Sequence, residues 1–125
     1  MNKKIVLTGV SFIIIGIVLG AFGAHSLKKV LNADRLLSFE VGVRYQLFHG
    51  LALVVLGALS DRLLVGSKWS TRFIILGVLL FSCSIYLLSL QDLLGVSLQF
   101  LGPLTPIGGS FMIVGWILLI KRISG

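Results

Sequence analysis

Residues 5–24 read IVLTGVSFIIIGIVLGAFGA, a run of twenty residues without a charged side chain. An α-helix rises about 1.5 Å per residue, so a run of this length crosses a hydrocarbon core about 30 Å thick. Apolar and polar residues do not alternate along it, which excludes a strand of a membrane barrel. The run therefore predicts a transmembrane helix.

Three more apolar segments follow, at about 45–59, 73–90 and 104–120. Hydrophobic residues make up 57% of the 125-residue chain and charged residues only 12%, whereas soluble domains carry about 25% charged residues. So few charges cannot solvate a soluble fold of this size. The sequence predicts an all-α integral membrane protein, a single transmembrane domain over residues 1–125 built as a four-helix bundle.

The segment between the first two spans predicts a short additional helix. Asn32 is a favourable N-cap, and Leu36, Phe39 and Val43 follow it at spacings of three and four residues. That spacing places the three apolar side chains on one face. We expect a short amphipathic helix that lies at the membrane interface and runs into the second span near Gly42.

The net charge of +7 has a different meaning here than in a soluble protein. The basic residues stand at the ends of the apolar runs, which suits anionic headgroups and topology control and argues against nucleic acid as a partner. With four spans, one side of the membrane receives Lys3, Lys4, Arg62, Lys68, Arg72, Lys121 and Arg122. The other side receives Lys28, Lys29, Arg35 and Arg44. This imbalance predicts that both termini are cytoplasmic.

The N-terminus also has an alternative interpretation. Lys3 and Lys4 precede an apolar stretch that ends in residues 21–23, AFG, and this order resembles a cleavable secretory signal. The apolar run is long for a signal peptide and carries glycines at helix-packing spacing. An uncleaved first span is therefore the favoured interpretation.

Glycines recur at spacings of three, four and seven residues within the spans, which places them on one face of each helix. Lipid chains are as apolar as leucine, so membrane helices associate where small residues let their backbones approach. The glycines predicted to pack the bundle are Gly16, Gly20, Gly23, Gly50, Gly57, Gly108 and Gly115.

Polar residues of the spans are expected to gather at the outer side, where spans one and two and spans three and four connect. The cluster comprises His25, Glu40, Arg44, Tyr45, Gln46, His49, Gln91, Asp92 and Thr105. Glu40 and Arg44 are spaced to pair along one helix, and His25 is expected near His49 or Glu40. Polar groups in a membrane usually face the bundle interior. The cluster is interpreted as a hydrogen-bonded staple, and alternatively as a site for a lipid headgroup, a small ligand or an ion.

Enzymatic and metal signatures are sparse. The two histidines and Glu40 lack the spacing of a zinc site, and no nucleophile motif or phosphate loop occurs. We expect no metal and no cofactor, and a non-enzymatic role is favoured. Two alternatives remain open: a channel or transporter formed by a homo-oligomer, and a membrane-embedded enzyme that acts on a lipid through a histidine.

Three motifs carry a resemblance to a known family. Residues 20–25 read GAFGAH, residues 40–53 read EVGVRYQLFHGLAL, and residues 102–109 read GPLTPIGG. Together they resemble the small bacterial inner-membrane proteins of the YgdD/YwdK type, over essentially the whole chain. The resemblance implies four spans, an uncleaved N-terminus and membrane lipids as neighbours. It implies no activity, because the function of that family is unknown.

Overall fold

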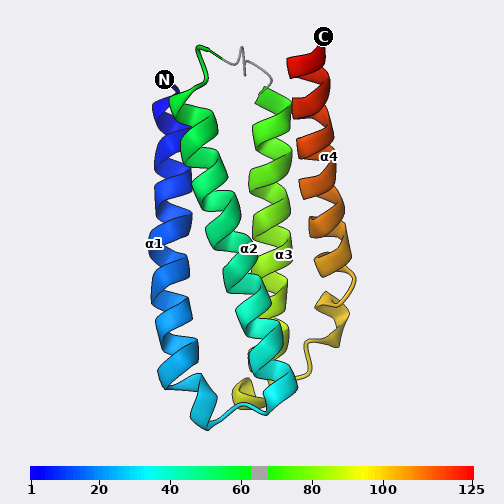
Figure 1. Ribbon diagram of the computed structural model, residues 1–125. Coiled ribbons are helices and arrows are strands. Elements are labelled where there is room, and N and C mark those ends of the chain that lie inside the picture. Colours follow the sequence, from blue (N-terminus) through cyan, green and yellow to red (C-terminus); the bar gives the residue numbers. More distant parts are fainter. Residues whose placement is uncertain (63–67) are drawn as a thin grey trace.

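The computed structural model describes residues 1–62 and 68–125, and its helices run antiparallel to their neighbours along the chain (Figure 1). Two short 3-10 turns lie in the connections, η1 at Leu27–Lys29 and η2 at Gln99–Leu101. The four long helices are α1 (Lys3–His25), α2 (Ala33–Ala58), α3 (Lys68–Leu94) and α4 (Leu104–Ser124). All four are long and apolar enough to cross a membrane. The predicted fold class is confirmed.

The bundle has two distinguishable ends. Both termini lie at one end, called here the terminal end, and the connections α1–α2 and α3–α4 lie toward the opposite, distal end (Figure 1). At the terminal end the backbone N–H of Asn2 donates to Gly57 O at 2.8 Å, and the amino group of Met1 pairs with Asp61. The hydrogen bond from the Met1 amino group lowers the pKa of the Asp61 carboxyl below its usual value.

Local sequence signals explain where the helices begin and end. The side chains of Asn2 and Asn32 accept hydrogen bonds from Ile5 N and Arg35 N and so cap α1 and α2. Gly95, just beyond α3, has a φ of 70°, a left-handed conformation that glycine adopts without strain. Pro103 immediately precedes α4, where its missing N–H costs nothing.

The short amphipathic helix expected between the first two spans is not a separate element. Residues 33–42 are helical, but they form the first turns of the continuous 26-residue helix α2. Their apolar face packs on protein instead of lying on lipid. Phe39 is 1% exposed and clusters with Leu27 and Val43, against Tyr86 and Leu90 of α3. The residues expected to form an interfacial helix therefore belong to the same helix as the second span.

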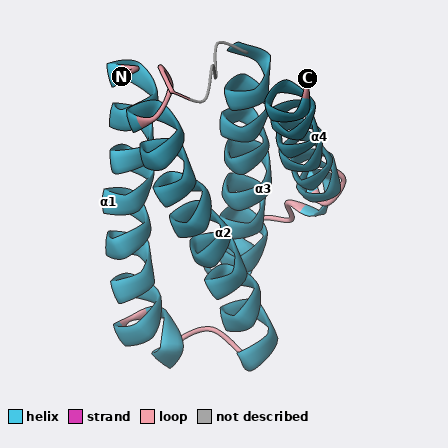
Figure 2. Cartoon of the chain, turned by 45° about the horizontal axis from the view of Figure 1, so that its top comes forward, coloured by secondary structure: helices cyan, strands magenta, loops and turns pink. Residues whose placement is uncertain are grey.

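Glycines bring the helices of each sequential pair into backbone contact. A Cβ on Gly9 of α1 would lie 2.5 Å from the carbonyl oxygen of Gly50 in α2. A Cβ on Gly108 of α4 would lie 2.4 Å from the backbone nitrogen of Phe81 in α3. A Cβ built on any of the seven predicted packing glycines would lie within contact distance of an atom of a neighbouring helix. The two pairs, α1 with α2 and α3 with α4, then join through α2 and α3 (Figure 2).

Helix α4 begins beside the middle of α3. The hydroxyl of Thr105, in the first turn of α4, lies 2.7 Å from that of Ser84. Ser84 is ten residues before the end of α3 at Leu94, a distance of about 15 Å along the helix. The distal part of α3 therefore extends past α4, and the connection through η2 runs alongside it (Figure 1).

The contact of α3 with α4 makes a direct prediction about glycine. Gly108→Ala places a methyl group against backbone atoms of Phe81 and Gly77, which cannot move aside, and we expect it to destabilise the bundle by about 1–3 kcal/mol or more. Gly109→Ala is the matched control, because its Cβ would meet nothing closer than 3.8 Å. Thermal unfolding in detergent measures both. Equal stability of the two variants would contradict the packing described.

Candidate functional site

The polar residues predicted to form one cluster at the outer end lie in separate places. Because α2 begins at Ala33, Tyr45, Gln46 and His49 lie twelve to sixteen residues along it, about 18–24 Å from its start. His25 ends α1 at the distal end of the bundle. The expectation of a single outer cluster is wrong in this respect, since it placed the start of the second span about one dozen residues too late.

Gln46 lies at the centre of a buried network between three helices. Its side-chain Nε2 donates to the carbonyl oxygen of Phe12 in α1 at 2.9 Å. Its Oε1 accepts from the hydroxyl of Tyr86 in α3 at 2.7 Å. Gln46 is 6% exposed, so both bonds are shielded from solvent and lipid. This arrangement supports the interpretation of Gln46 as a staple.

His49 is held between α2 and α4 with both ring nitrogens bonded. Nδ1 lies 2.8 Å from the carbonyl oxygen of Tyr45, which only accepts, so Nδ1 carries the proton. Nε2 then accepts from the indole N–H of Trp116 at 3.1 Å. A neutral imidazole satisfies both contacts. The ring therefore has no nitrogen free to take a proton from a substrate, as a general base must.

The remaining members of the predicted cluster are dispersed. His25, Glu40 and Arg44 are exposed. In the described part of the chain, Glu40 and Arg44 form no ion pair with each other or with another residue, so the predicted pair along α2 is absent. His49 contacts Tyr45 and Trp116 and not His25. Thr105 bonds to Ser84 and lines a cavity.

That cavity, of about 520 Å³, is the best-formed candidate site. It lies toward the distal end between α2, α3 and the connection to α4, where the late start of α4 leaves α3 uncovered. Its lining residues come from these three segments and are Arg35, Ser38, Val41, Ile85, Leu88, Ser89, Gln91, Gln99, Gly102 and Thr105. Apolar surface predominates, with a few polar groups, which is typical of ligand sites.

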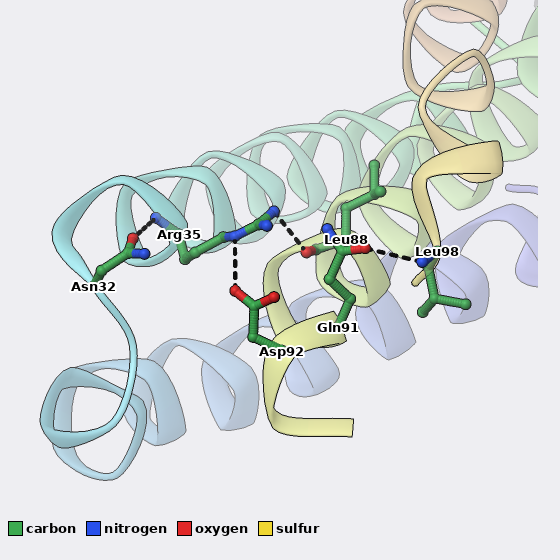
Figure 3. A network of polar contacts seen from close by, with 6 residues as sticks. All are labelled: Asn32, Arg35, Leu88, Gln91, Asp92 and Leu98. Carbon is green, nitrogen blue, oxygen red and sulfur yellow. Dashed lines mark hydrogen bonds and ion pairs between the residues drawn. The ribbon is translucent and has the colours of Figure 1, made fainter. Parts of the chain in front are cut away.

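Arg35 reaches from α2 across to the end of α3 (Figure 3). Its Nη1 donates to the carbonyl oxygen of Leu88 at 3.1 Å, and its Nε lies 3.4 Å from the Asp92 carboxylate. Next to it, Gln91 is 5% exposed and its Oε1 accepts from Leu98 N at 2.9 Å. The contacts of Arg35 hold α2 against the end of α3 and keep the guanidinium at the cavity wall, and the bond of Gln91 holds the α3–α4 connection against α3.

Ser89 is the unusual member of the cavity wall. It is 1% exposed, and its hydroxyl has no hydrogen-bond partner among the described residues. A buried polar group without a partner costs about 1–3 kcal/mol. The other buried serines of α3 do have partners: Ser70 donates to Gly115 O and Ser82 to Gly42 O, each at 2.8 Å, and Ser84 donates to Phe81 O at 2.9 Å. Ser89 is therefore the buried serine of α3 whose hydroxyl the described residues leave without a partner.

The sequence signal for this site was weak. Arg35 stands in a charged segment next to Asp34 and looked like a topology determinant, and Ser89 is a single hydroxyl inside an apolar run. Of the nine residues predicted to cluster at the outer end, only Gln91, Asp92 and Thr105 line this cavity or form an ion pair with a residue that lines it. Across residues 1–62 and 68–125 no group of three or more His, Cys, Asp or Glu side chains is arranged to hold a metal ion.

Comparison with known proteins places the chain among membrane proteins. The family described as "Protein of unknown function (DUF423)" matches residues 19–109. The chain is 36% identical to the UPF0382 membrane protein SH2409 of Staphylococcus haemolyticus, over 94% of this chain and 93% of the relative. It belongs to the UPF0382 (DUF423) family. The resemblance expected from the three sequence motifs is confirmed.

Other UPF0382 relatives show similar agreement. The UPF0382 inner membrane protein YgdD of Escherichia coli K12 is 38% identical over 83% of this chain and 76% of its own length. The UPF0382 membrane protein SAB0533 of Staphylococcus aureus is 40% identical over 81% of this chain and 79% of its own length. No solved structure matches the chain significantly. All residues that line the cavity lie within the DUF423 match at 19–109, whereas Trp116 lies outside it.

The central network predicts a measurable coupling between Gln46 and Tyr86. Gln46→Leu removes the acceptor of the hydrogen bond between these residues, and Tyr86→Phe removes its donor. Tyr86→Phe keeps the ring contact with Phe39, in which the two ring centroids are 5.0 Å apart. We expect a coupling free energy of about 0.6–1.7 kcal/mol, the range of interhelical hydrogen bonds in membranes. A double-mutant cycle of unfolding in mixed micelles measures it. Strictly additive effects would show that the bond does not staple the bundle.

Proposed function

We propose that this membrane protein is non-enzymatic and binds the phosphate of a phospholipid in the distal cavity, while its central polar network staples the bundle. The unpartnered hydroxyl of Ser89 in the cavity wall carries the proposal. A hydroxyl donates well to a phosphate oxygen, which would remove the cost of leaving Ser89 unpaired. Membrane lipids surround the protein and are the most abundant source of this group.

Arg35 supports an anionic ligand atom at the same place. A guanidinium has five N–H donors, and the contacts with Leu88 and Asp92 leave donors for a further acceptor. Arginine suits phosphate because its planar fork binds two oxygens together. Asp92 reduces the local positive charge, so the site fits a phosphodiester with one negative charge better than a free multivalent anion.

The start of α4 adds a second source of positive potential. Gly102, two residues before its first residue Leu104, and Thr105, directly after it, line the cavity. Pro103 provides no side-chain cap, and the hydroxyl of Thr105 is bonded to Ser84 instead. Thr105 N and Ile107 N donate to Gly102 O and Pro103 O, and Pro106 has no N–H, so the start of α4 contributes the positive end of the helix dipole, which favours an anion.

The rest of the cavity suits the apolar part of a lipid. Val41, Ile85 and Leu88 supply apolar lining, and the volume of about 520 Å³ lies within the usual range of small-ligand sites, about 300–1,000 Å³. The cavity is partly open to the bundle surface, so acyl chains would extend into the surrounding bilayer. A cavity that combines polar groups with a mainly apolar lining favours a lipid over a water-soluble molecule.

Two serine variants test the site without confusing binding with folding. Ser89→Ala removes a hydroxyl that bonds to nothing described, so we expect unchanged or higher stability without lipid and an affinity for phospholipid reduced about tenfold. Ser82→Ala is the control, because it breaks a bond to Gly42 and should lower stability. Native mass spectrometry with phosphatidylglycerol and phosphatidylethanolamine measures retained lipid, and thermal unfolding measures stability.

Arg35 provides a second comparison within that experiment. Arg35→Gln should release lipid more strongly than Ser89→Ala, whereas Lys28→Gln removes a charge at the same end that does not line the cavity and should have no effect. Wild-type protein without retained lipid would contradict the proposal. Equal losses in the Arg35 and Lys28 variants would show only general attraction to headgroups.

The orientation of the bundle is part of the proposal. The terminal end carries the larger share of basic residues, and Arg44, counted on the distal side from the sequence, lies within α2. Excess Lys and Arg mark the cytoplasmic side, so the termini are proposed to be cytoplasmic and the cavity to face the outer leaflet of a bacterial inner membrane.

Reporter fusions at the C-terminus check this orientation. Fused green fluorescent protein should fluoresce, and fused alkaline phosphatase, which needs an oxidising compartment for its disulfides, should stay inactive. The reverse pattern would place the cavity on the cytoplasmic side. It would leave the lipid-binding proposal itself intact.

A further inference from the structure

A stripe of exposed side chains runs along the outside of α2, away from the distal cavity. Leu37, Phe48, Leu51 and Val55 are 60%, 66%, 58% and 47% exposed, and their spacing places them on one face of the helix. An apolar face of this kind suits lipid. Glu40 and Arg44 lie on the same stripe and are also exposed, but their charges do not suit contact with lipid chains.

The position of Arg44 makes an isolated charge expensive. It lies eleven residues from the start of α2 at Ala33, about 16 Å along the helix. A hydrocarbon core about 30 Å thick leaves only about 4 Å of a 26-residue helix outside it at each end. The backbone of Arg44 is therefore well inside the core, where unpaired charges are costly and charged residues are usually paired.

The residues that the structure describes supply no partner for either charge. Glu40 and Arg44 are one turn apart, yet no ion pair between them is formed, and none with any other described residue. Between them and α1 lies a groove of about 280 Å³, whose α1 wall is made by Gly20 and Gly23. These glycines provide a hollow beside the charges and no counter-ion.

We propose that this face of α2 binds the same face of a second copy in a parallel two-fold dimer, with Glu40 of each chain paired to Arg44 of the other. A two-fold interface joins the same patch of both chains. When Glu40 of one chain contacts Arg44 of the other, Arg44 of the first chain therefore also contacts Glu40 of the second. Neighbouring helices in coiled coils use the same reciprocal pairing of side chains about one turn apart. The long arginine side chain spans the offset of about 6 Å along the axis.

A second copy fits the two charges better than a lipid does. A lipid phosphate would pair with Arg44 and leave Glu40 alone, and a lipid ammonium would do the opposite. A second copy neutralises both residues on both chains at once. The groove lined by Gly20 and Gly23 also provides each copy with a hollow beside its projecting side chains, of which Phe48 is the most exposed on the stripe.

Charge reversal of one residue at a time tests the dimer. Glu40→Arg places like charges opposite each other in both reciprocal pairs, and Arg44→Glu does the same with the opposite sign. Each variant alone should be monomeric. When the two variants are mixed, every pair becomes attractive again, so a one-to-one heterodimer should form. Pairing within one chain cannot produce this result.

The measurement uses the full chain with two different affinity tags, in detergent and in nanodiscs. Wild type should be dimeric by native mass spectrometry, and the mixed variants should co-purify at least tenfold more than either variant with itself. Lys28→Glu is the control for a charge reversal outside the stripe and should leave the dimer unchanged. Unfolding curves establish that each variant is folded.

The outcomes decide the proposal. Monomeric wild type, dimers that persist in both single variants, or mixed variants that fail to associate would each overturn it. If a reversed variant does not fold, Glu40→Gln and Arg44→Gln replace the reversals, and each should weaken the dimer about tenfold. Unchanged association in both neutral variants would equally overturn it. None of these residues lines the distal cavity, so the result is independent of lipid binding there.

Discussion

Close approach of helix backbones at glycine is the contact on which the rest of the structure depends. Where Gly9 meets Gly50, no side chain separates α1 from α2. At such distances a polar side chain on one helix reaches a backbone carbonyl on the next, as Gln46 does with Phe12 and Ser82 with Gly42. The bundle therefore combines van der Waals packing with interhelical hydrogen bonds, the two forces available where lipid surrounds the helices.

The same close contact, applied to α3 and α4, creates the distal cavity. Gly108 packs directly against the backbone of Phe81. This contact positions α4 so that the first turn of α4 lies beside Ser84 instead of beside the end of α3. Pro103 ends the connection and starts the helix at that level. A part of α3 is left without α4 to cover it, and the α3–α4 connection runs beside it instead. Ser89 lies in this part and stays 1% exposed, with a hydroxyl that has no partner among the described residues.

The fold could be predicted from sequence because hydropathy and glycine spacing are local signals. The position of the polar residues could not, since it depends on where each helix begins. Hydropathy placed the start of span two near Tyr45, because Asp34, Arg35, Glu40 and Arg44 lower the local average. The helix begins earlier, after the Asn32 cap. Moving the start shifts His49 and Gln46 from the end of the helix to its middle and separates them from His25.

Charge in the first three turns of α2 has different consequences on different faces. Arg35 faces α3, where the Leu88 carbonyl and Asp92 hold it and protein shields it in part. Glu40 and Arg44 face outward, where no described residue pairs with them. Helix periodicity separates these faces, so one segment serves a cavity inside the chain and a surface outside it. The charges that weaken the hydropathy signal of α2 are therefore the residues on which the proposed lipid site and the proposed dimer depend.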